Sequence, residues 1–376
     1  MTAVIDSCFD GGNIRRIDRN NQSQIRLAID ADAGGEFYQW FYFRITATRG
    51  SEFQVVIENA ATSSYPAGWE NYNVVVSNDQ ENWYRIETVY DSGGLRFTVA
   101  LQSDVLWVAY FTPYSLQQHA ELIGRVSKVQ NVSCRVLGHT VDGRSIDCLQ
   151  IGNPNAAIKM WAIARQHPGE TMAQWWMEGY LKRLTDHNDP VVRELLKLGV
   201  FYVVPNMNPD GSYRGYLRTN ALGRNLNREW RKATAEYSPE VYYVRQKMHE
   251  TGVDFCLDVH GDEAIPYNFI AGTEGIESWN EQRQQLQEKF KSKLRSANPD
   301  FQTTVGYPVT PPGRANYDIC SSYIAETFNC PAMTLEMPFK DNELSPDPLV
   351  GWSAERSAKL GYSCIDAIYS IVDHLS

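Results

Sequence analysis

The sequence predicts two domains of different classes, namely an antiparallel β-sandwich domain over residues 1–112 and an α/β domain over residues 113–376. In the second domain we expect a doubly wound, mainly parallel sheet with helices on both faces. Three observations support this division. Residues 25–112 contain strand patterns without a helical period, apolar strands alternate with amphipathic segments after Pro113, and 376 residues are long for a single hydrophobic core.

Five short segments of the first domain are rich in aromatic and β-branched residues, and each is bounded by Gly, Asn, Asp or Ser. They cover residues 37–47, 52–59, 72–77, 83–89 and 95–101. Such residues favour strands, and the glycine and polar residues between them are typical of turns. Because no helix separates these strands, we expect them to pair in antiparallel order and to pack as a sandwich.

The second domain is predicted from four apolar strands, at 158–164, 200–205, 253–259 and 332–337. Amphipathic helices are expected between and after them, at 171–185, 189–198, 238–251, 277–297 and 352–375. Asp189 followed by Pro190 is a clear start signal, because a polar N-cap and a proline suit the first turn of a helix. Strands that alternate with helices in this way favour a parallel sheet.

Composition excludes several classes of function. A net charge of −10 argues against general binding to nucleic acid or to an anionic membrane, since both require basic surface. No apolar run is long enough to span a bilayer, and the first residues lack the pattern of an export signal. Seven scattered cysteines without a C-x-x-C motif are typical of reduced thiols. We therefore expect a cytoplasmic protein with no nucleic-acid or membrane partner, and its oligomeric state stays open.

Polar residues follow the expected strands. The motif R-Q-H-P-G-E places His167 and Glu170 in a loop after the first strand, because Pro168 disfavours a helix there. N-P-D-G (208–211) follows the second strand, and His260 follows the third. The carboxyl ends of parallel strands meet at one edge of a sheet, so these side chains can converge. Taken alone, the first His and Glu are equally compatible with a solvated loop.

Two histidines and one glutamate form the open three-ligand set of hydrolytic zinc sites, in which water takes the fourth position. We therefore expect His167, Glu170 and His260 to bind Zn2+. Glu336 ends the fourth strand, A-M-T-L-E, where a carboxylate is costly unless it is paired or used. Glu336 is therefore a candidate catalytic residue, with a structural ion pair as the alternative.

A basic segment lies between the second strand and His260. Residues 213–232 contain five arginines and one lysine against a single acid, Glu229. In a protein of negative net charge, this concentration predicts a wall that binds an anion, because guanidinium groups pair with carboxylates through two parallel hydrogen bonds. A solvated basic face is the alternative interpretation.

Several motifs together resemble the zinc carboxypeptidase family. In chain order they are H-P-G-E, N-P-D-G, R-G-Y-L-R, G-R-N-L-N-R, D-V-H-G and T-L-E-M-P, within residues 113–376. The cytosolic carboxypeptidase branch is the most similar, since its catalytic domain follows a β-sandwich domain to which W-F-Y-F-R, W-Y-R and V-A-Y-F-T-P-Y are similar. The resemblance implies a zinc metallocarboxypeptidase, a hydrolase that releases the C-terminal residue of a peptide or protein, with His167, Glu170 and His260 as zinc ligands.

The resemblance also implies roles for four further residues. Arg218 matches the arginine that polarises the scissile carbonyl and stabilises the oxyanion. Asn227 and Arg228 match the pair that binds the terminal carboxylate of the substrate. Glu336 matches the general base, which takes a proton from water and passes it to the leaving amine.

Two positions depart from the family pattern. Asn225 stands where the family usually has an acid that is hydrogen-bonded to the first zinc histidine. An amide can still orient His167 through its carbonyl oxygen, but it brings no charge, so metal affinity is expected to be lower. The tyrosine that caps the substrate carboxylate is not placed by a motif. Tyr317 is preferred to Tyr323 because of its position nineteen residues before Glu336.

The cytosolic carboxypeptidase branch is known for removing C-terminal glutamates. If this chain shares that preference, the pocket for the side chain of the released residue must contain a cation. Arg314 or an arginine of the basic segment 213–232 could supply it, and no motif decides between them; for Arg314, a local ion pair with Asp318 is the alternative. Asp262 and Glu263 follow the third zinc ligand and are interpreted as solvated loop acids, with contact to a zinc ligand or to the substrate as the alternative.

Two other functions stay open. One is a zinc amidohydrolase of the desuccinylase or aspartoacylase type, which acts on N-acyl amino acids and shares the core fold. The other is a catalytically inactive protein that binds C-terminal tails. Activity on acylated amino acids without activity on peptides distinguishes the first, and absence of zinc distinguishes the second.

Overall fold

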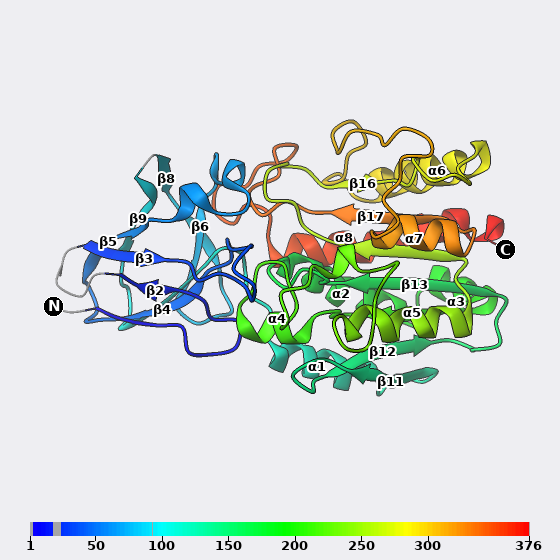
Figure 1. Cartoon of the computed structure of the whole chain (residues 1–376), viewed down its shortest axis with the longest axis horizontal. Helices are drawn as coiled ribbons and strands as arrows, with labels where there is room; N and C mark the ends of the chain where they lie inside the picture. Colours follow the sequence, from blue (N-terminus) through cyan, green and yellow to red (C-terminus); the bar gives the residue numbers. More distant parts are fainter. Residues whose placement is uncertain (1–2, 18–23, 92, 376) are drawn as a thin grey trace.

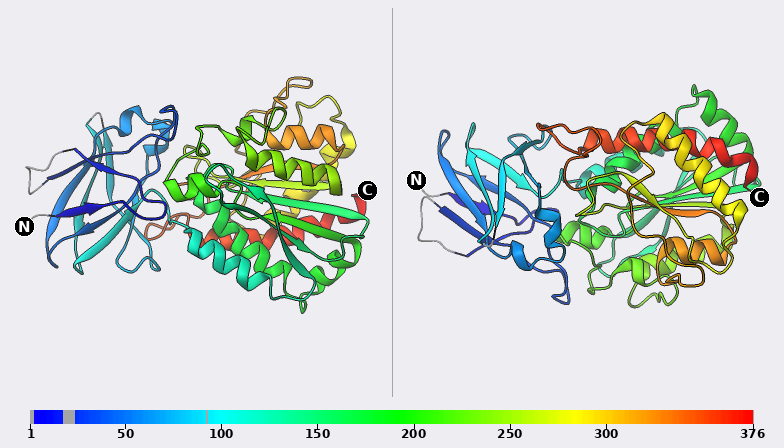
Figure 2. Two further views of the ribbon diagram at one scale, coloured as in Figure 1. Left: turned by 60° about the horizontal axis from the view of Figure 1, so that its bottom comes forward. Right: turned by 90° about the horizontal axis from the view of Figure 1, so that it is seen from above.

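The computed structural model describes residues 3–17, 24–91 and 93–375. An all-β domain lies at one end of the molecule, and an α/β domain that contains the C-terminus lies at the other (Figures 1 and 2). All seven cysteines are free. Within the described residues, no helix is both long and apolar enough to cross a membrane.

In the described part of the N-terminal domain, the strands form two five-stranded sheets. The first has the order β1 (Val4–Asp6), β4 (Tyr42–Thr46), β10 (Val105–Ala109), β6 (Val74–Ser77) and β7 (Tyr84–Ile86). The second has the order β2 (Arg15–Arg16), β3 (Gln24–Ala28), β5 (Glu52–Ile57), β9 (Gly94–Ala100) and β8 (Thr88–Asp91). Side chains of both sheets join one buried core, as a sandwich requires. As predicted, the described strands of this domain pair in antiparallel orientation, except for β3 and β5, which are parallel.

A seven-stranded sheet runs through the described C-terminal domain. Its order is β11 (Val132–His139), β12 (Ser145–Ile151), β14 (Gly199–Val204), β13 (Ile158–Ala164), β15 (Phe255–Val259), β17 (Ala332–Glu336) and β16 (Phe269–Ala271). The four central strands are the predicted ones, and they are mutually parallel. The outer strands pair antiparallel and were not predicted, so the sheet is mixed overall. Strand β11 is half exposed along much of its length, which removes the apolar pattern that identifies a strand.

Helices cover both faces of this sheet, which confirms the doubly wound prediction. The predicted helices are α2 (Thr171–Leu184), α3 (Pro190–Leu198), α5 (Pro239–Thr251), α6 (Glu281–Ala297) and α8 (Ala354–Ile371). Unpredicted ones are α1 (Leu116–Val126), α4 (Pro209–Arg214) and α7 (Cys320–Thr327), with short 3-10 turns at Ala60–Thr62, Pro66–Trp69, Leu226–Arg228 and Val372–His374. Buried side chains of α2, α3, α6 and α8 join the core on one face, and those of α5 and α7 join the core on the other. Asp189 caps α3 as expected, accepting hydrogen bonds from Val191 and Val192.

The two domains are joined by buried polar contacts. Arg85 is 8% exposed, and its guanidinium donates to the carbonyl oxygens of Phe339 and Trp352 in the C-terminal domain. In the other direction, Lys340 donates to the carbonyl oxygen of Glu70 at 2.7 Å. The ring of Phe339 also stacks on Tyr110 with centroids 4.4 Å apart. Because these groups are buried, the domains form a fixed junction.

Candidate metal centre and substrate cleft

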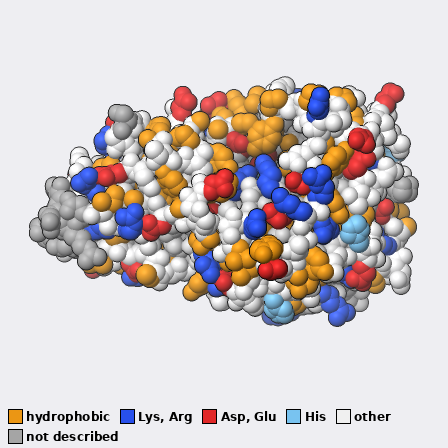
Figure 3. All heavy atoms as spheres, in the orientation of Figure 1, with side chains coloured by type: hydrophobic (Ala, Val, Ile, Leu, Met, Phe, Trp, Pro, Cys, Tyr) orange, Lys and Arg blue, Asp and Glu red, His pale blue; other side chains and the backbone are white. Residues whose placement is uncertain are grey.

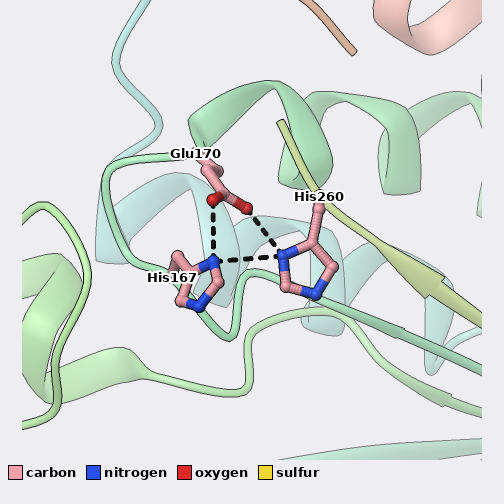
Figure 4. A group of neighbouring side chains, drawn as sticks. All are labelled: His167, Glu170 and His260. Carbon is pink, nitrogen blue, oxygen red and sulfur yellow. Dashed lines mark hydrogen bonds and ion pairs between the residues drawn. The ribbon is translucent and has the colours of Figure 1, made fainter. Parts of the chain in front are cut away.

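The three candidate metal ligands meet at the carboxyl edge of the sheet (Figure 4). His167 lies in the loop after β13, Glu170 directly precedes α2, and His260 follows β15. The Nδ1 atoms of the two histidines are 3.2 Å apart, and the Glu170 carboxylate lies 2.7 Å from one and 2.8 Å from the other. One ligand atom from each residue falls within 4.8 Å of the others, and all three residues are buried. Such a cluster can enclose a single ion.

Hydrogen bonds from Arg165 stabilise the conformation of the H-P-G-E loop. This residue directly follows β13 and has a left-handed φ of 59°, which is uncommon for a residue with a side chain. Its buried guanidinium donates to the carbonyl oxygens of Pro168 (3.0 Å) and Tyr114 (2.8 Å). A side chain at Gly169 would approach the carbonyl oxygen of Leu217 to 2.9 Å, so glycine is required for this close packing. The loop is therefore fixed before any metal binds.

A further polar contact orients each histidine. Nε2 of His167 lies 3.0 Å from Oδ1 of Asn225, as the sequence suggested, and Nε2 of His260 lies 2.9 Å from Oδ2 of Asp258. Gln166 donates to the same Asp258 oxygen at 2.7 Å. These contacts leave Nδ1 of both rings directed at Glu170, which fixes the nitrogen available to a metal. The role of Asp258 was missed, although its position two residues before the histidine in D-V-H-G places both side chains on one side of the strand.

The protonation of the three ligands differs because their neighbours differ. Burial, together with Arg218, lowers the pKa of His167 to about 4. Burial disfavours a charged His260, but Asp258 and Glu170 outweigh it and hold the His260 pKa well above its usual value. Burial would raise the pKa of Glu170, and the two histidines hold it below its ordinary value instead. The neutral His167 and the ionised Glu170 are therefore in the forms that bind a metal.

A cavity of about 670 Å3 opens above the three ligands. Five further residues that were predicted from the sequence to be catalytic or substrate-binding line this cavity: Arg218, Asn227, Arg228, Arg314 and Glu336. Glu336 ends β17 and is 6% exposed, and among the described residues its Oε2 atom has no hydrogen-bond partner. Burial raises the pKa of this carboxyl well above its ordinary value, and Glu170 and Asp262 add to the effect while His260 opposes it. A buried carboxylate oxygen without a protein partner is free to bind water or substrate.

The guanidinium of Arg218 lies close to the metal ligands. Its Nη1 atom lies 4.0 Å from Oε1 of Glu170, and its guanidinium lies 5.4 Å from the ring of Tyr65 and 5.8 Å from the ring of Phe37. Both rings belong to the N-terminal domain, which therefore forms part of the cleft. Burial works against the charge of Arg218, but Tyr65 and Glu170 outweigh it and raise the arginine's pKa.

The two residues expected to bind a carboxylate are held by backbone contacts. Oδ1 of Asn227 accepts a hydrogen bond from the backbone N–H of Cys320 at 2.8 Å. Nη1 of Arg228 donates to the carbonyl oxygen of Asn227 at 2.7 Å. Burial and the nearby Arg218 lower the pKa of Arg228, as expected for two guanidinium groups that share a cavity. An anionic ligand between them would relieve this repulsion.

The other residues of the basic segment do not reach the cavity. Lys and Arg side chains gather near the middle of the molecular face drawn in Figure 3. Arg214 forms an ion pair with Asp142, and Arg231 forms one with Asp318. Of the basic residues in the predicted anion-binding wall, only Arg218 and Arg228 line the cavity, and Arg314 joins them from outside that segment. In the described part of the chain, Arg314 forms no ion pair with Asp318.

Tyr317 lies outside the lining of the cavity, and its hydroxyl accepts a hydrogen bond from the backbone N–H of Glu277 at 3.2 Å. Tyr307, which the sequence did not single out, lines the cavity instead, and its hydroxyl donates to Oδ2 of Asp262 at 2.7 Å. No sequence motif marks Tyr307, because it lies in an irregular segment between α6 and α7. Tertiary structure alone brings it to the cleft.

The interpretation of Glu263 as a solvated loop acid was wrong. Its side chain lines the cavity, and the residue is only 6% exposed. Packing against the N-terminal domain buries it, since a side chain at Gly68 would come within 2.9 Å of its Cβ atom. Burial, with Glu170 nearby, raises the pKa of Glu263 to about 8. Asp262 is half-buried, and its Oδ1 atom accepts hydrogen bonds from two backbone N–H groups of its own loop.

Two protein-family models match this chain. Residues 5–111 match the cytosolic carboxypeptidase N-terminal domain, and residues 125–348 match the zinc carboxypeptidase model, which covers more than half of the chain. The chain belongs to the zinc carboxypeptidase family. It is accordingly a metallocarboxypeptidase, and its cofactor is zinc. The residues fit the ion, because two nitrogens and one carboxylate converge as the family's chemistry requires and leave an open side toward the cavity.

Relatives of this carboxypeptidase span its whole length. An uncharacterized protein of Zymomonas mobilis subsp. mobilis is 47% identical over 375 residues, which cover 100% of this chain and 98% of that protein. The crystal structure of a metallo-carboxypeptidase from Burkholderia cenocepacia is 45% identical, with a TM-score of 0.96 over 99% of this chain and 100% of the other.

A third relative carries a ligand. The structure of a metallo-carboxypeptidase from Pseudomonas aeruginosa in complex with (2-guanidinoethylmercapto)succinic acid is 41% identical, with a TM-score of 0.96 over 99% of this chain and 100% of the other.

Bovine cytosolic carboxypeptidase 3 is 27% identical over 314 residues, which cover 73% of this chain and 31% of the bovine protein. The chain thus spans only about a third of the length of the bovine relative.

Proposed function

We propose that this carboxypeptidase hydrolyses the C-terminal peptide bond of peptide or protein substrates. The observation that supports the proposal is that one cavity is lined both by the three metal ligands and Glu336 and by Arg218, Asn227 and Arg228. A site for hydrolysis therefore lies beside a site for a carboxylate. This arrangement suits a peptide bond one residue away from a free C-terminus.

His167, Glu170 and His260 would hold the zinc ion, with Asn225 and Asp258 orienting the two imidazoles. When bound, zinc acts as a Lewis acid that polarises the scissile carbonyl and lowers the pKa of water. The nearby Glu336 has no bond from the described residues at Oε2, so this oxygen can accept a hydrogen bond from water.

Glu336 would act as the general base. Its carboxylate takes a proton from the attacking water as the water oxygen bonds to the carbonyl carbon. It then delivers that proton to the leaving amine nitrogen as the carbon–nitrogen bond breaks. Arg218 would donate hydrogen bonds to the oxyanion that forms from the carbonyl oxygen. Asn227 and Arg228 would bind the terminal carboxylate throughout, which places the bond for attack.

For the released residue we propose a preference for acidic side chains, glutamate in particular. The supporting feature is Arg314, which lines the cavity and, within the described residues, forms no ion pair. The Arg314 side chain is exposed and, among the described residues, unpaired, so it is available to a carboxylate of the released residue. We also keep Tyr307 and Tyr317 as alternative caps for the terminal carboxylate, with the cavity position favouring Tyr307.

A basic released residue is the competing specificity, and one observation favours it. The compound bound by the P. aeruginosa enzyme contains a guanidinium group as well as two carboxylates. In this chain Glu274 also lines the cavity, so a carboxylate is present that could pair with such a group. Glu274 already accepts a hydrogen bond from Gln287 at 2.6 Å, and this makes it a weaker candidate for binding a basic side chain of the substrate.

The test uses zinc-loaded protein and peptides that differ only in their last residue. We expect release of the last residue, fastest for glutamate, and a loss of about a hundredfold or more in kcat for Glu336→Gln. Faster release of arginine or lysine would replace the acidic preference by the basic one. Cleavage of an N-acyl amino acid with no cleavage of any peptide would overturn the proposal in favour of an amidohydrolase. Peptide binding without release of any residue, unchanged in Glu336→Gln, would indicate a catalytically inactive binding protein.

We further propose a cytoplasmic location, because all seven cysteines are free thiols. The net charge of −10 supports the proposal that neither nucleic acid nor an anionic membrane is a partner. Residues 1–112 and 113–376 are our proposed limits of the two domains, with the peptide C-terminus as the substrate of the second.

A further inference from the structure

Asp32 is a buried acid of the N-terminal domain that contacts the C-terminal domain. It lies in the turn after β3 and is 3% exposed. Its partners are about 185 residues away in the sequence, in the segment Leu217–Thr219. Nothing in the local sequence around Asp32 distinguishes it from the exposed Asp30, whose side chain pairs with Arg15 at the surface.

Both carboxylate oxygens of Asp32 accept hydrogen bonds from this segment. Oδ1 accepts from the backbone N–H of Leu217 at 2.7 Å. Oδ2 accepts from the backbone N–H groups of Arg218 at 2.8 Å and Thr219 at 2.9 Å, and from the Thr219 hydroxyl at 3.1 Å. Three successive N–H groups that converge on one carboxylate require a single backbone conformation. Four bonds to one buried anion therefore determine the path of the chain on both sides of Arg218.

The same segment also touches the metal-binding loop. The carbonyl oxygen of Leu217 accepts a hydrogen bond from the backbone N–H of Gly169 at 2.9 Å. The segment thus lies between the H-P-G-E loop on one side and the N-terminal domain on the other. Asn13 of that domain adds a bond to the carbonyl oxygen of Gly215 at 2.8 Å. Small displacements of this backbone would move the guanidinium of Arg218 relative to the metal ligands.

We propose that Asp32 is a positioning residue for Arg218, so that the N-terminal domain completes the active site rather than only packing beside it. The proposal rests on the oxyanion-stabilising function proposed for Arg218. Phe37 and Tyr65, from the same domain, flank the guanidinium and limit its movement. Asp32 thus determines where the arginine's backbone lies, and the two rings determine where its side chain points.

A different result is expected if Asp32 has only a structural role. Its replacement would then lower the stability of the protein and would affect kcat no more than other destabilising substitutions do. A positioning Asp32 changes kcat selectively, because oxyanion stabilisation is felt in the transition state and hardly in the bound substrate. Displacement of a catalytic group by about 1 Å can cost roughly a hundredfold in rate.

The experiment uses the full-length zinc-loaded protein with Asp32→Asn and, as the matched control, Asp30→Asn. The amide is isosteric with the acid, but its NH2 group faces N–H groups that need an acceptor. We expect Asp32→Asn to lower kcat about ten- to a hundredfold with KM changed less than about threefold and with unchanged zinc content. Asp30→Asn is expected to leave both constants unchanged.

A double-mutant cycle with Arg218→Met separates positioning from stability. In the Arg218→Met background, Asp32→Asn should lower kcat less than about threefold, because the group that it positions is absent. Equal losses from Asp32→Asn in both backgrounds would overturn the inference while leaving the function of Arg218 intact. An unchanged kcat for Arg218→Met itself would overturn both. If Asp32→Asn does not fold, Thr219→Val replaces it, since it removes only the hydroxyl's bond to Oδ2, and the same non-additivity is expected on a smaller scale.

Discussion

At the residue scale, the metal centre combines ligands whose charges are set by different neighbours. His167 is kept neutral by burial and Arg218, whereas His260 is kept protonated by Asp258 and Glu170. The zinc-free site therefore holds a proton that the ion has to displace. This difference between two histidines of the same cluster has a measurable consequence for metal binding.

We predict that zinc binding at neutral pH releases about one proton per ion, because His260 must lose its proton to bind. Zinc affinity should accordingly rise as the pH increases from about 6.5, the ordinary pKa of histidine, toward the raised pKa of His260. Calorimetric titration in buffers of different ionisation enthalpy gives the proton count. Asp258→Asn removes the main cause of the shift and should reduce the count, and equal counts in both proteins would contradict the prediction.

The raised pKa also affects folding of the zinc-free protein. The folded chain holds a proton on His260 that the unfolded chain releases at a lower pH. This contribution to the free energy of unfolding is fully present below about pH 6.5 and is lost as the pH rises through the folded pKa. Urea unfolding of zinc-free protein at several pH values should show this decline, and Asp258→Asn should flatten it.

The two candidate tyrosines give a second prediction at this scale. Tyr307→Phe should raise KM for peptides about tenfold, because one hydrogen bond to a charged carboxylate is worth about 1.5 kcal/mol or more. Tyr317→Phe should leave KM unchanged, since its hydroxyl binds the Glu277 N–H outside the cavity. Steady-state kinetics of the two variants decide between them. A raised KM for Tyr317→Phe alone would restore the choice made from the sequence.

At the scale of elements, helices α2 and α8 pack unusually closely beneath the metal centre. Two glycines allow this approach, because a Cβ atom at Gly179 would lie 1.7 Å from the carbonyl oxygen of Ala358 and one at Gly361 would lie 2.1 Å from that of Trp176. Helix α2 begins immediately after Glu170. The position of this metal ligand therefore depends on how tightly the two helices fit.

We predict that Gly179→Ala destabilises the protein by about 1–3 kcal/mol, because the added methyl group forces the helices apart. Helix propensity alone predicts the opposite sign, a gain of up to about 1 kcal/mol. Gly124→Ala in α1 is the matched control, since an added Cβ there meets no atom within 4 Å and propensity should prevail. Denaturant unfolding measures both changes, and a stabilised Gly179→Ala variant would show that the helices can adjust without cost.

At the scale of the whole molecule, the two domains meet at a junction that is buried and polar. Asn13 and Arg85 of the N-terminal domain donate hydrogen bonds to carbonyl oxygens of the C-terminal domain. Asp32 accepts hydrogen bonds from backbone N–H groups of the C-terminal domain. Buried donors and acceptors that lose their partners are costly, so separating the domains is unfavourable. Part of the substrate cleft lies at this junction, which makes its integrity relevant to catalysis.

We predict that Arg85→Met lowers the free energy of unfolding by about 3 kcal/mol or more, because buried carbonyl oxygens lose a charged donor. Arg96→Met, which breaks an exposed ion pair with Asp91, should cost less than about 1 kcal/mol. Fluorescence and circular dichroism should report one shared unfolding transition for the wild-type protein. Two separate transitions would show that the domains unfold independently.

The sequence alone determined which residues stand at the ends of the central strands. Apolar runs followed by His167, His260 and Glu336 are local patterns, and parallel strands place their carboxyl ends together for reasons of geometry. Helix boundaries followed from caps such as Asp189, because a cap acts within one turn. The edge strands were missed, since β11 is half exposed and has no apolar period to detect.

Only the tertiary structure decided which other residues meet these ligands. Asp32 and Glu263 carry no motif, and each owes its burial to contact between domains whose sequences are far apart. Tyr307 reaches the cleft on an irregular segment that has no periodicity. The physical reason is common to all three. A sequence pattern reports interactions between near neighbours along the chain, whereas these side chains are placed by a contact across 45 residues, for Tyr307, or by contacts between the two domains.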